Sequence, residues 1–222
     1  MTKTVEITLY QFDELNDKAK EKAVHNYHTN WMCDDWYQCT YEMMKEEGEH
    51  KHGFRVDDIR FSGFWSQGDG ASWCGAVDLG DWVRKTFNST DLEHPLTQIF
   101  LALLDEGWIE SKVLVSFNSS RYSHENTMHV NTIDHYYKID DDSVMEIGMF
   151  KGALVADLIK MLDCEGGFLS SLDERLDREC KDFARYIYRE LERDYEGQTT
   201  EEAIAESYAI NDVWFDETGR IA

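Results

Sequence analysis

Apolar residues alternate along several segments of this 222-residue chain, and this spacing predicts strands because neighbouring side chains of a strand point to opposite faces. The first such segment contains Val5, Ile7 and Leu9. Two aromatic strands are predicted on either side of the sequence SQGDG, with alternating residues Ile59, Phe61, Gly63 and Trp65, then Trp73, Gly75, Val77 and Leu79. Residues Lys112–Asn118 and Thr127–Ile133 predict a second hairpin, and "YYKID" and "VMEIG" around "DDS" predict a third.

Apolar residues at helical spacing fill the segments between these strands. The first helix is predicted after a cap at Asp13, on a ridge of Leu15, Ala19, Ala23, Tyr27 and Trp31. Trp36, Cys39 and Met43 continue this ridge, either directly or after a break at "CDD", up to a stop at Gly48. Pro95 opens a helix that is apolar nearly all round and therefore buried. A further helix carries Phe150, Leu154, Leu158 and Leu162 and ends at Gly166 and Gly167. The longest helix has a seam of Leu169, Leu172, Leu176, Cys180, Phe183, Ile187 and Leu191.

The order of these elements predicts the fold class. Strands and helices are mixed without a regular strand–helix–strand alternation, which favours an α+β fold with a mostly antiparallel sheet of hairpins covered by helices. The chain contains only one proline, and it has neither a glycine- and serine-rich linker nor an internal repeat. We therefore expect a single domain over residues 1–222.

The charge is strongly negative, with 45 acidic against 22 basic residues and a formal net charge of −23. Such a surface repels phosphate backbones, so direct nucleic-acid binding is not expected. It can attract a basic groove of another protein, as a nucleic-acid mimic does, or it only keeps the chain soluble. The five cysteines have no C-x-x-C spacing, and no apolar run reaches the ~18 residues of a membrane span. These features predict reduced thiols, a cytoplasmic location and no membrane partner.

The sequence SQGDG is the first candidate site. Gln67 to Gly70 link two strands, and glycines on both sides of Asp69 permit the positive φ angles of tight connections, so a plain turn explains the glycines. The surrounding polar and aromatic side chains, in contrast, suit a planar ligand or a partner side chain. The candidate binding residues here are Trp65, Ser66, Gln67, Asp69 and Trp73.

The loop "SSRYSHEN" is the second candidate site and contributes Arg121, Tyr122, His124 and Glu125. Arginine can hold a phosphate or carboxylate, and His124 with Glu125 has the groups for acid–base chemistry. The alternative is an exposed polar loop with a local salt bridge. We expect this loop and the SQGDG hairpin to lie at the same edge of one sheet, where Asp69 can face Arg121 or His124.

Metal and cofactor motifs are weak, so no metal and no cofactor are expected. His50 and His52 in "EHKH" lack further ligands at zinc spacing, and "DDDS" lacks the calcium-loop pattern. A basic strip of the longest helix has residues four apart, with Asp177, Glu192 and Glu196 close enough to neutralise it. These basic residues are Lys181, Arg185, Arg189 and Arg193. Two interpretations are open: these residues form an internal salt-bridge network, or they dock an acidic partner such as a second copy of this chain.

Three motifs, "FSGFWSQGDGASW", "RYSHENTM" and "NDVWFDETGRIA", together with the opening "YQFDELNDKAKEKAVHNY", resemble a family of uncharacterised phage and prophage proteins. Some of its members are labelled antitoxins of toxin–antitoxin systems. The resemblance touches nearly the whole chain and implies a phage setting, in the host cytoplasm, without transferring any catalytic residue. Small acidic phage proteins that bind host machinery, such as anti-restriction and anti-CRISPR proteins, offer an analogy.

The leading hypothesis is therefore a phage-encoded acidic binding protein, not an enzyme, that inhibits or redirects a host factor such as a defence system. Its partner would be a host protein, for example one that binds nucleic acid. The alternatives are a nucleotide-binding or hydrolytic site at the two loops, and an antitoxin. A concave pocket that gathers Ser66, Gln67, Asp69, Arg121 and His124 would favour the small-molecule site, whereas a flat surface would favour a protein partner.

Overall fold

In the computed structural model, the chain forms two compact units. Unit 1 contains Met1–Thr40 and Glu190–Ala222, and unit 2 contains Tyr41–Arg189. The structure describes residues 6–32, 34–118, 122–133 and 167–222, together with Val155, Asp157, Leu158, Lys160, Met161 and Leu162. The predicted third hairpin and most of the helix around Leu154 lie outside the described residues.

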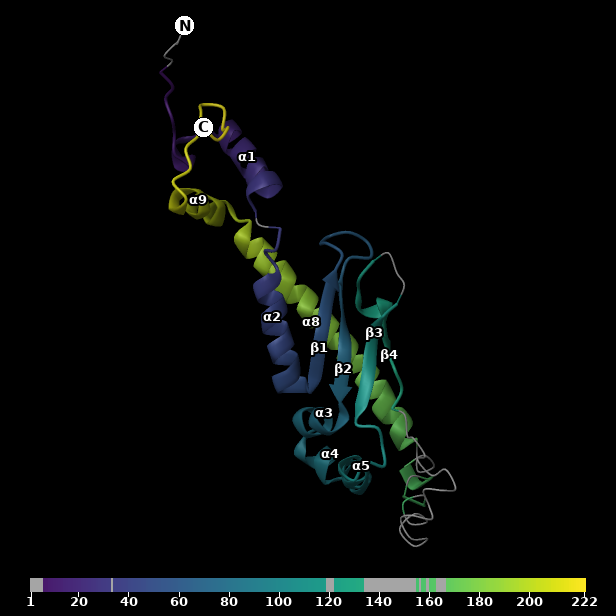
Figure 1. Ribbon diagram of the computed structural model, residues 1–222. Coiled ribbons are helices and arrows are strands. Elements are labelled where there is room, and N and C mark those ends of the chain that lie inside the picture. Colours follow the sequence, from purple (N-terminus) through teal and green to yellow (C-terminus); the bar gives the residue numbers. More distant parts are fainter. Residues whose placement is uncertain are drawn as a thin grey trace. The chain divides into compact units, whose positions relative to one another are not determined.

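Unit 2 is built on an antiparallel sheet of four described strands in the order β1-β2-β3-β4 (Figure 1). The strands are β1 (Phe54–Phe61), β2 (Ala71–Asp78), β3 (Lys112–Phe117) and β4 (Met128–Val130). Together with the helices, this sheet confirms the predicted α+β class. The predicted pairing of the two aromatic strands is confirmed by a register that places Ile59 opposite Trp73.

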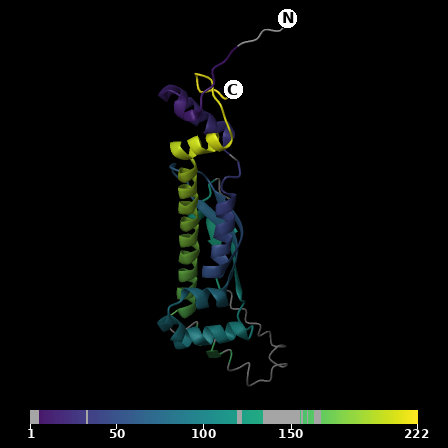
Figure 2. The same ribbon diagram turned by 90° about the vertical axis from the view of Figure 1, so that its left-hand side faces the viewer.

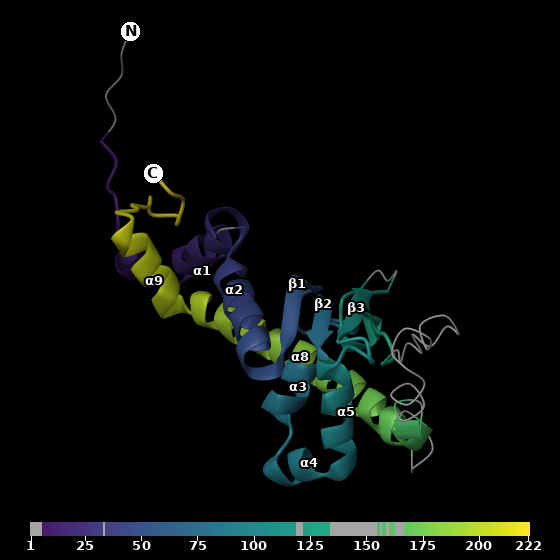
Figure 3. The same ribbon diagram turned by 60° about the horizontal axis from the view of Figure 1, so that its bottom comes forward.

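The helices of unit 2 cluster at one end of the sheet and along one of its faces. At the end opposite the loop between β1 and β2 lie α3 (Leu79–Thr86), α4 (Ser89–Glu93) and α5 (Pro95–Asp105) (Figure 3). Beside β1 lies α2 (Gln38–Glu47), which continues into the π-helical turn η3 (Gly48–His52). As predicted, α5 begins at Pro95 and is buried, at Thr97, Phe100, Leu101, Leu103 and Leu104.

The core of unit 2 forms where α8 (Phe168–Gln198) covers one face of the sheet (Figure 2). Phe183 of this helix packs on the rings of Phe54 and Trp73, at centroid distances of 5.5 and 5.9 Å. The indole nitrogen of Trp73 donates a 3.1 Å hydrogen bond to the carbonyl oxygen of Cys180. The predicted seam of the longest helix is confirmed, since all seven of its residues, from Leu169 to Leu191, are buried.

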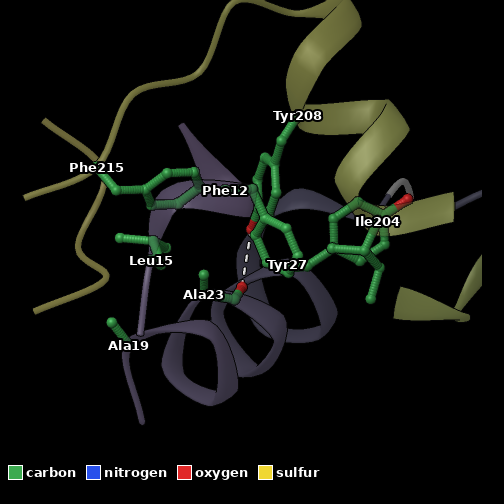
Figure 4. Packing of buried hydrophobic residues seen from close by; sticks show 8 residues of the cluster. All are labelled: Phe12, Leu15, Ala19, Ala23, Tyr27, Ile204, Tyr208 and Phe215. Atoms are coloured by element: carbon green, nitrogen blue, oxygen red, sulfur yellow. Dashed lines mark hydrogen bonds between the residues drawn. The ribbon is translucent and has the colours of Figure 1, made fainter. Parts of the chain in front are cut away.

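Unit 1 joins the two ends of the chain around a second apolar core (Figure 4). Its helices are α1 (Asp17–Asn26), followed by the π-helical turn η2 (Tyr27–Trp31), and α9 (Glu201–Ile210). The buried side chains come from both ends, and they are Phe12, Leu15, Ala19, Ala23, Tyr27, Ile204, Tyr208 and Phe215. Aromatic rings supply most of this volume, with Tyr208 and Phe215 only 4.9 Å apart.

The first predicted strand is wrong. Tyr10 pairs with Phe215 as an isolated bridge, and the preceding Ile7 and Leu9 are exposed because none of the described strands pairs with them. The predicted cap is also wrong, because Asp13 lies in the 3₁₀ turn η1 (Phe12–Glu14). Asn16 caps α1 instead, by accepting a hydrogen bond from the Ala19 nitrogen at 3.1 Å.

The predicted ridge of α2 and its stop at Gly48 need correction too. Met43 is exposed and Met44 is fully buried, because α2 begins anew at Gln38 and does not keep the phase of the α1 ridge. The helical turns continue past Gly48 to Gly53, whose φ of 72° ends them. Likewise β1 ends at Phe61 rather than Trp65, because Gly63 and Trp65 leave the extended region with φ of 106° and 67°.

Candidate functional site

The two loops that the sequence singled out lie against each other at one end of the sheet. The first, residues 62–70, joins β1 to β2 and is longer than the four residues expected. The second, residues 122–126, belongs to the connection between β3 and β4. The Ser62 hydroxyl joins them, since it lies within hydrogen-bond distance of the carbonyl oxygens of Gly68 (3.3 Å) and Ser123 (3.1 Å). We call residues 62–70 and 122–126 the paired-loop surface.

The two glycines of SQGDG explain this close approach. Gly68 has a φ of 92°, which an L side chain rarely adopts, and it faces the ring of Tyr122. At Gly70 the constraint is space, because a Cβ there would lie 2.5 Å from the Cβ of His124. The glycines therefore do more than shape a turn: Gly70 makes room for the second loop.

Asp69 organises its own loop. Its carboxylate accepts a 2.7 Å hydrogen bond from the Ser66 nitrogen, and its nitrogen donates to the Ser66 carbonyl oxygen at 3.1 Å. Such reciprocal bonds are typical of aspartate in tight turns. Ser66 and Gln67 are exposed at the tip of this loop. The expected partner of Asp69, Arg121, lies outside the described residues.

His124 and Glu125 have structural partners. The His124 Nδ1 accepts a 3.1 Å hydrogen bond from the Asn126 nitrogen, and so caps the 3₁₀ turn η4 (Glu125–Thr127). The carboxylate of Glu125 lies 3.6 Å from the guanidinium of Arg185 in α8. Both groups therefore hold the second loop in place, and this geometry does not form the acid–base pair considered for a hydrolase.

Among the predicted binding residues that the structure describes, Trp73 alone is removed from the surface. It is 0% exposed, stacks on Phe54 with ring centroids 5.3 Å apart, and donates its indole hydrogen to Cys180. The reason is its register, because Trp73 and Ile59 share the face of the sheet that α8 covers. It cannot form the wall of a groove at the loops.

Trp65, in contrast, is 68% exposed and has a left-handed backbone with a φ of 67°. Its ring contacts Phe64, which stands 5.5 Å from Tyr188 of α8 and 5.7 Å from Phe61. Tyr122 adds a second exposed ring from the other loop. The sequence analysis did not select Phe64 or Tyr188, although the phenylalanine next to Trp65 was a usable signal.

A second site, missed by sequence reasoning, is a cleft in unit 2 with a volume of about 460 Å³. It lies among residues of η3, α3 and α8, which are Lys51, His52, Lys85, Thr86, Glu179, Asp182, Phe183, Tyr186 and Arg189. The usable signals were the sequence "KH", which we interpreted as part of a solvated turn, and the basic strip of α8, for which we considered a salt-bridge network or a docking surface. Three of the four basic residues do form ion pairs: Lys181 with Asp177, Arg185 with Asp182 and Glu125, and Arg193 with Glu190. Of the three acidic residues predicted to neutralise them, Asp177 is confirmed, whereas the partners of Arg185 and Arg193 differ from Glu192 and Glu196.

No metal site or membrane helix emerges from the described part of the chain. No group of three or more histidine, cysteine, aspartate or glutamate side chains there is placed to hold a metal ion. His52 stacks on Phe54 at 5.2 Å, and burial lowers the pKa of its imidazole. Within the same residues, none of the helices has the length and apolar character that crossing a membrane requires.

The chain belongs to the family defined by a domain of unknown function, DUF8835, whose model matches residues 36–201. No curated protein matches the chain, and no solved structure matches it. The matched segment contains all of unit 2, and therefore both the paired-loop surface and the cleft. All eight buried residues of the unit 1 core lie outside it.

Proposed function

We propose that this protein acts by binding another protein through the paired-loop surface. The observation that carries the proposal is Trp65, a large apolar side chain that is mostly exposed at a strained backbone position. A left-handed conformation costs an L residue roughly 1–2 kcal/mol, and the exposed ring recovers little of this by burial. Strain of this kind gathers at functional sites, and tryptophan and tyrosine are the commonest anchors of protein interfaces.

The support around Trp65 fits an anchor of this kind. Phe64 packs between Phe61 and Tyr188 behind it, and the Ser62 hydroxyl ties its loop to the second loop. A preorganised aromatic group loses less conformational freedom on binding than a mobile one. Tyr122, 47% exposed, stands over Gly68 and extends the apolar surface to the second loop.

Following the resemblance to phage proteins, we propose that the partner is a host factor and that binding inhibits or redirects it. The net charge of −23 supports a basic partner, because opposite charge speeds the encounter of two proteins. The aromatic residues would then provide the short-range contacts, and the acidic remainder of the surface would steer the approach.

The test is capture of the partner from a host-cell extract by the immobilised protein, read by mass spectrometry. The double variant Trp65→Ala/Tyr122→Ala removes both exposed rings, and Trp214→Ala removes a partly exposed ring in unit 1 as the matched control. We expect the same host protein to be retained by the wild type and by Trp214→Ala and to be lost by the double variant. A partner retained equally by all three proteins would contradict the proposal.

A further inference from the structure

The cleft in unit 2 has the size of a small-molecule site. Its volume of about 460 Å³ falls within the ~300–1,000 Å³ that such sites occupy. Three elements that are distant in sequence contribute to it: η3, with Lys51 and His52; the end of α3, with Lys85 and Thr86; and α8, with Arg189. All of its residues belong to unit 2.

Most charges of the cleft are already paired. Lys51 pairs with Glu47, and Lys85 lies 2.9 Å from both the Asp81 carboxylate and the Glu49 carbonyl oxygen. The two acidic residues of the lining are engaged as well. Glu179 accepts hydrogen bonds from the Trp82 indole nitrogen (2.7 Å) and from Arg175 (2.8 Å), and Asp182 pairs with Arg185.

Arg189 differs from these residues. Its side chain is exposed at the cleft and has no ion pair with any described residue. Its neighbours Arg185 and Arg193 on the same helix are both paired. In a chain with more than twice as many acidic as basic residues, a guanidinium left without a carboxylate is available to an external anion.

Aromatic groups form the other half of the lining. Phe183 and Tyr186 of α8 have ring centroids 6.4 Å apart, and the imidazole of His52 lies 5.3 Å from Phe183. The hydroxyl of Tyr186 is 3.3 Å from the Glu47 carboxylate, which fixes the direction of its ring. Rings held in this way can support a planar group by stacking.

We propose that this cleft binds a small molecule that carries a phosphate next to a planar ring, of the nucleoside monophosphate class, with Arg189 on the phosphate and the ring against Tyr186. This site is distinct from the paired-loop surface and does not depend on the proposed protein binding. The sequence suggested a nucleotide site at the two loops. In the cleft, by contrast, aromatic and basic groups lie together.

The test is isothermal titration calorimetry with AMP, GMP, CMP and UMP, and with adenosine and inorganic phosphate alone. We expect at least one nucleotide to bind with a dissociation constant of about 1 mM or tighter, and more tightly than adenosine or phosphate. Arg189→Ala should weaken this binding at least about tenfold, because it removes the charge-assisted contact. The matched control is Arg193→Ala, one turn further along α8 with an exposed and paired side chain, and it should change binding less than about twofold.

Several outcomes would overturn the inference. These are no saturable binding of any nucleotide at millimolar concentration, phosphate that binds as tightly as the nucleotides, and binding that survives Arg189→Ala. Because Arg189 is exposed, both variants should keep the wild-type melting temperature, which separates lost binding from lost folding. A protein that binds no nucleotide yet still captures a partner through Trp65 would remove this inference and leave the proposed function intact.

Discussion

The hydroxyl of Tyr208 donates a 2.9 Å hydrogen bond to the carbonyl oxygen of Ala23, and so connects two helices from opposite ends of the chain. Tyr208 is fully enclosed, with its ring 5.6 Å from Tyr27 and 4.9 Å from Phe215. Figure 4 shows this bond at the centre of the unit 1 core.

Replacing Tyr208 by phenylalanine should keep the packing and remove this bond. We expect the free energy of unfolding to fall by about 1 kcal/mol, the usual net value of one hydrogen bond. Burial also raises the pKa of Tyr208, so the folded state keeps its proton longer than the unfolded state does. The resulting stability is complete below the unfolded pKa of about 10 and is lost as pH rises beyond it. Denaturant titrations from pH 7 to 11 should show a smaller alkaline loss in Tyr208→Phe, and equal losses would contradict this.

Gly70→Ala should force the paired loops apart. The added Cβ would lie 2.5 Å from the Cβ and 2.9 Å from the Cα of His124. Relieving this overlap requires the backbone of the second loop to move, because the Cα of His124 is a backbone atom. We expect a loss of about 1–3 kcal/mol, as for an overpacked core. Gly197→Ala is the matched control, because Gly197 lies in α8 with open space around it and should gain about 0.5–1 kcal/mol. Denaturant unfolding of both variants measures the contrast, and equal shifts would refute the role of Gly70.

Trp65→Gly should not destabilise the fold, although it removes an entire tryptophan side chain. Glycine relieves roughly 1–2 kcal/mol of left-handed strain but adds about 0.5–1 kcal/mol of unfolded-state entropy. We therefore expect an unfolding free energy between unchanged and about 1.5 kcal/mol higher. Trp214→Gly, at a position without positive φ, should lose stability through the same entropy and through the loss of the 3.0 Å hydrogen bond from its indole nitrogen to Asp212. If Trp65→Gly loses as much as Trp214→Gly, the strain at Trp65 is absent.

The cysteines should differ in reactivity toward an alkylating reagent. Cys39 is exposed, whereas Cys180 is buried in the seam of α8 and burial raises the pKa of its thiol well above the usual value. Because only the thiolate reacts, Cys180 should stay unmodified in the native protein while Cys39 is modified readily. Mass spectrometry before and after addition of denaturant tests this. Modification of Cys180 at the same native rate as Cys39 would show that the α8 core opens.

Binding through the paired-loop surface should persist at high salt, since its exposed residues carry no charge. They are Trp65, Ser66, Gln67, Tyr122 and Asn126. Raising the ionic strength from 0.15 to 1 M shortens the screening length from about 8 to about 3 Å. We expect the dissociation rate of the captured partner to change less than about threefold, while its association rate falls. Surface plasmon resonance separates the two rates. A steep rise of the dissociation rate with salt would assign the interface to the acidic surface instead.

The sequence predicted best where one period persisted over many residues. The α8 seam is confirmed, because its side-chain spacing directly records which face is buried. The nearly continuous apolar sequence of α5 is buried as predicted, and the two aromatic strands pair, although β1 ends at Phe61 and β2 at Asp78. Prediction failed where a partner far along the chain decides the structure. Ile7 and Leu9 alternate like a strand, yet only Tyr10 finds a partner, in Phe215.

The same distinction applies to the candidate sites. The sequence selected both loops, and the structure places them together through Ser62 and Gly70. The sequence did not show that Trp65 is exposed and Trp73 buried, since the exposure of each side chain depends on which face of the sheet α8 covers. The cleft was beyond sequence reasoning, because Lys51, Lys85 and Arg189 meet only after η3, α3 and α8 have packed.

The composition of the unit 1 core has a consequence for synthesis on the ribosome. Phe12, Leu15 and Tyr27 are translated long before Tyr208 and Phe215, which pack against them. Unit 2 is contiguous from Tyr41 to Arg189, so it can fold while the chain is still being made. Phe12, Leu15 and Tyr27 therefore stay exposed until α9 and Phe215 have been synthesised. A chain truncated before α9 would leave them permanently accessible to chaperones and proteases.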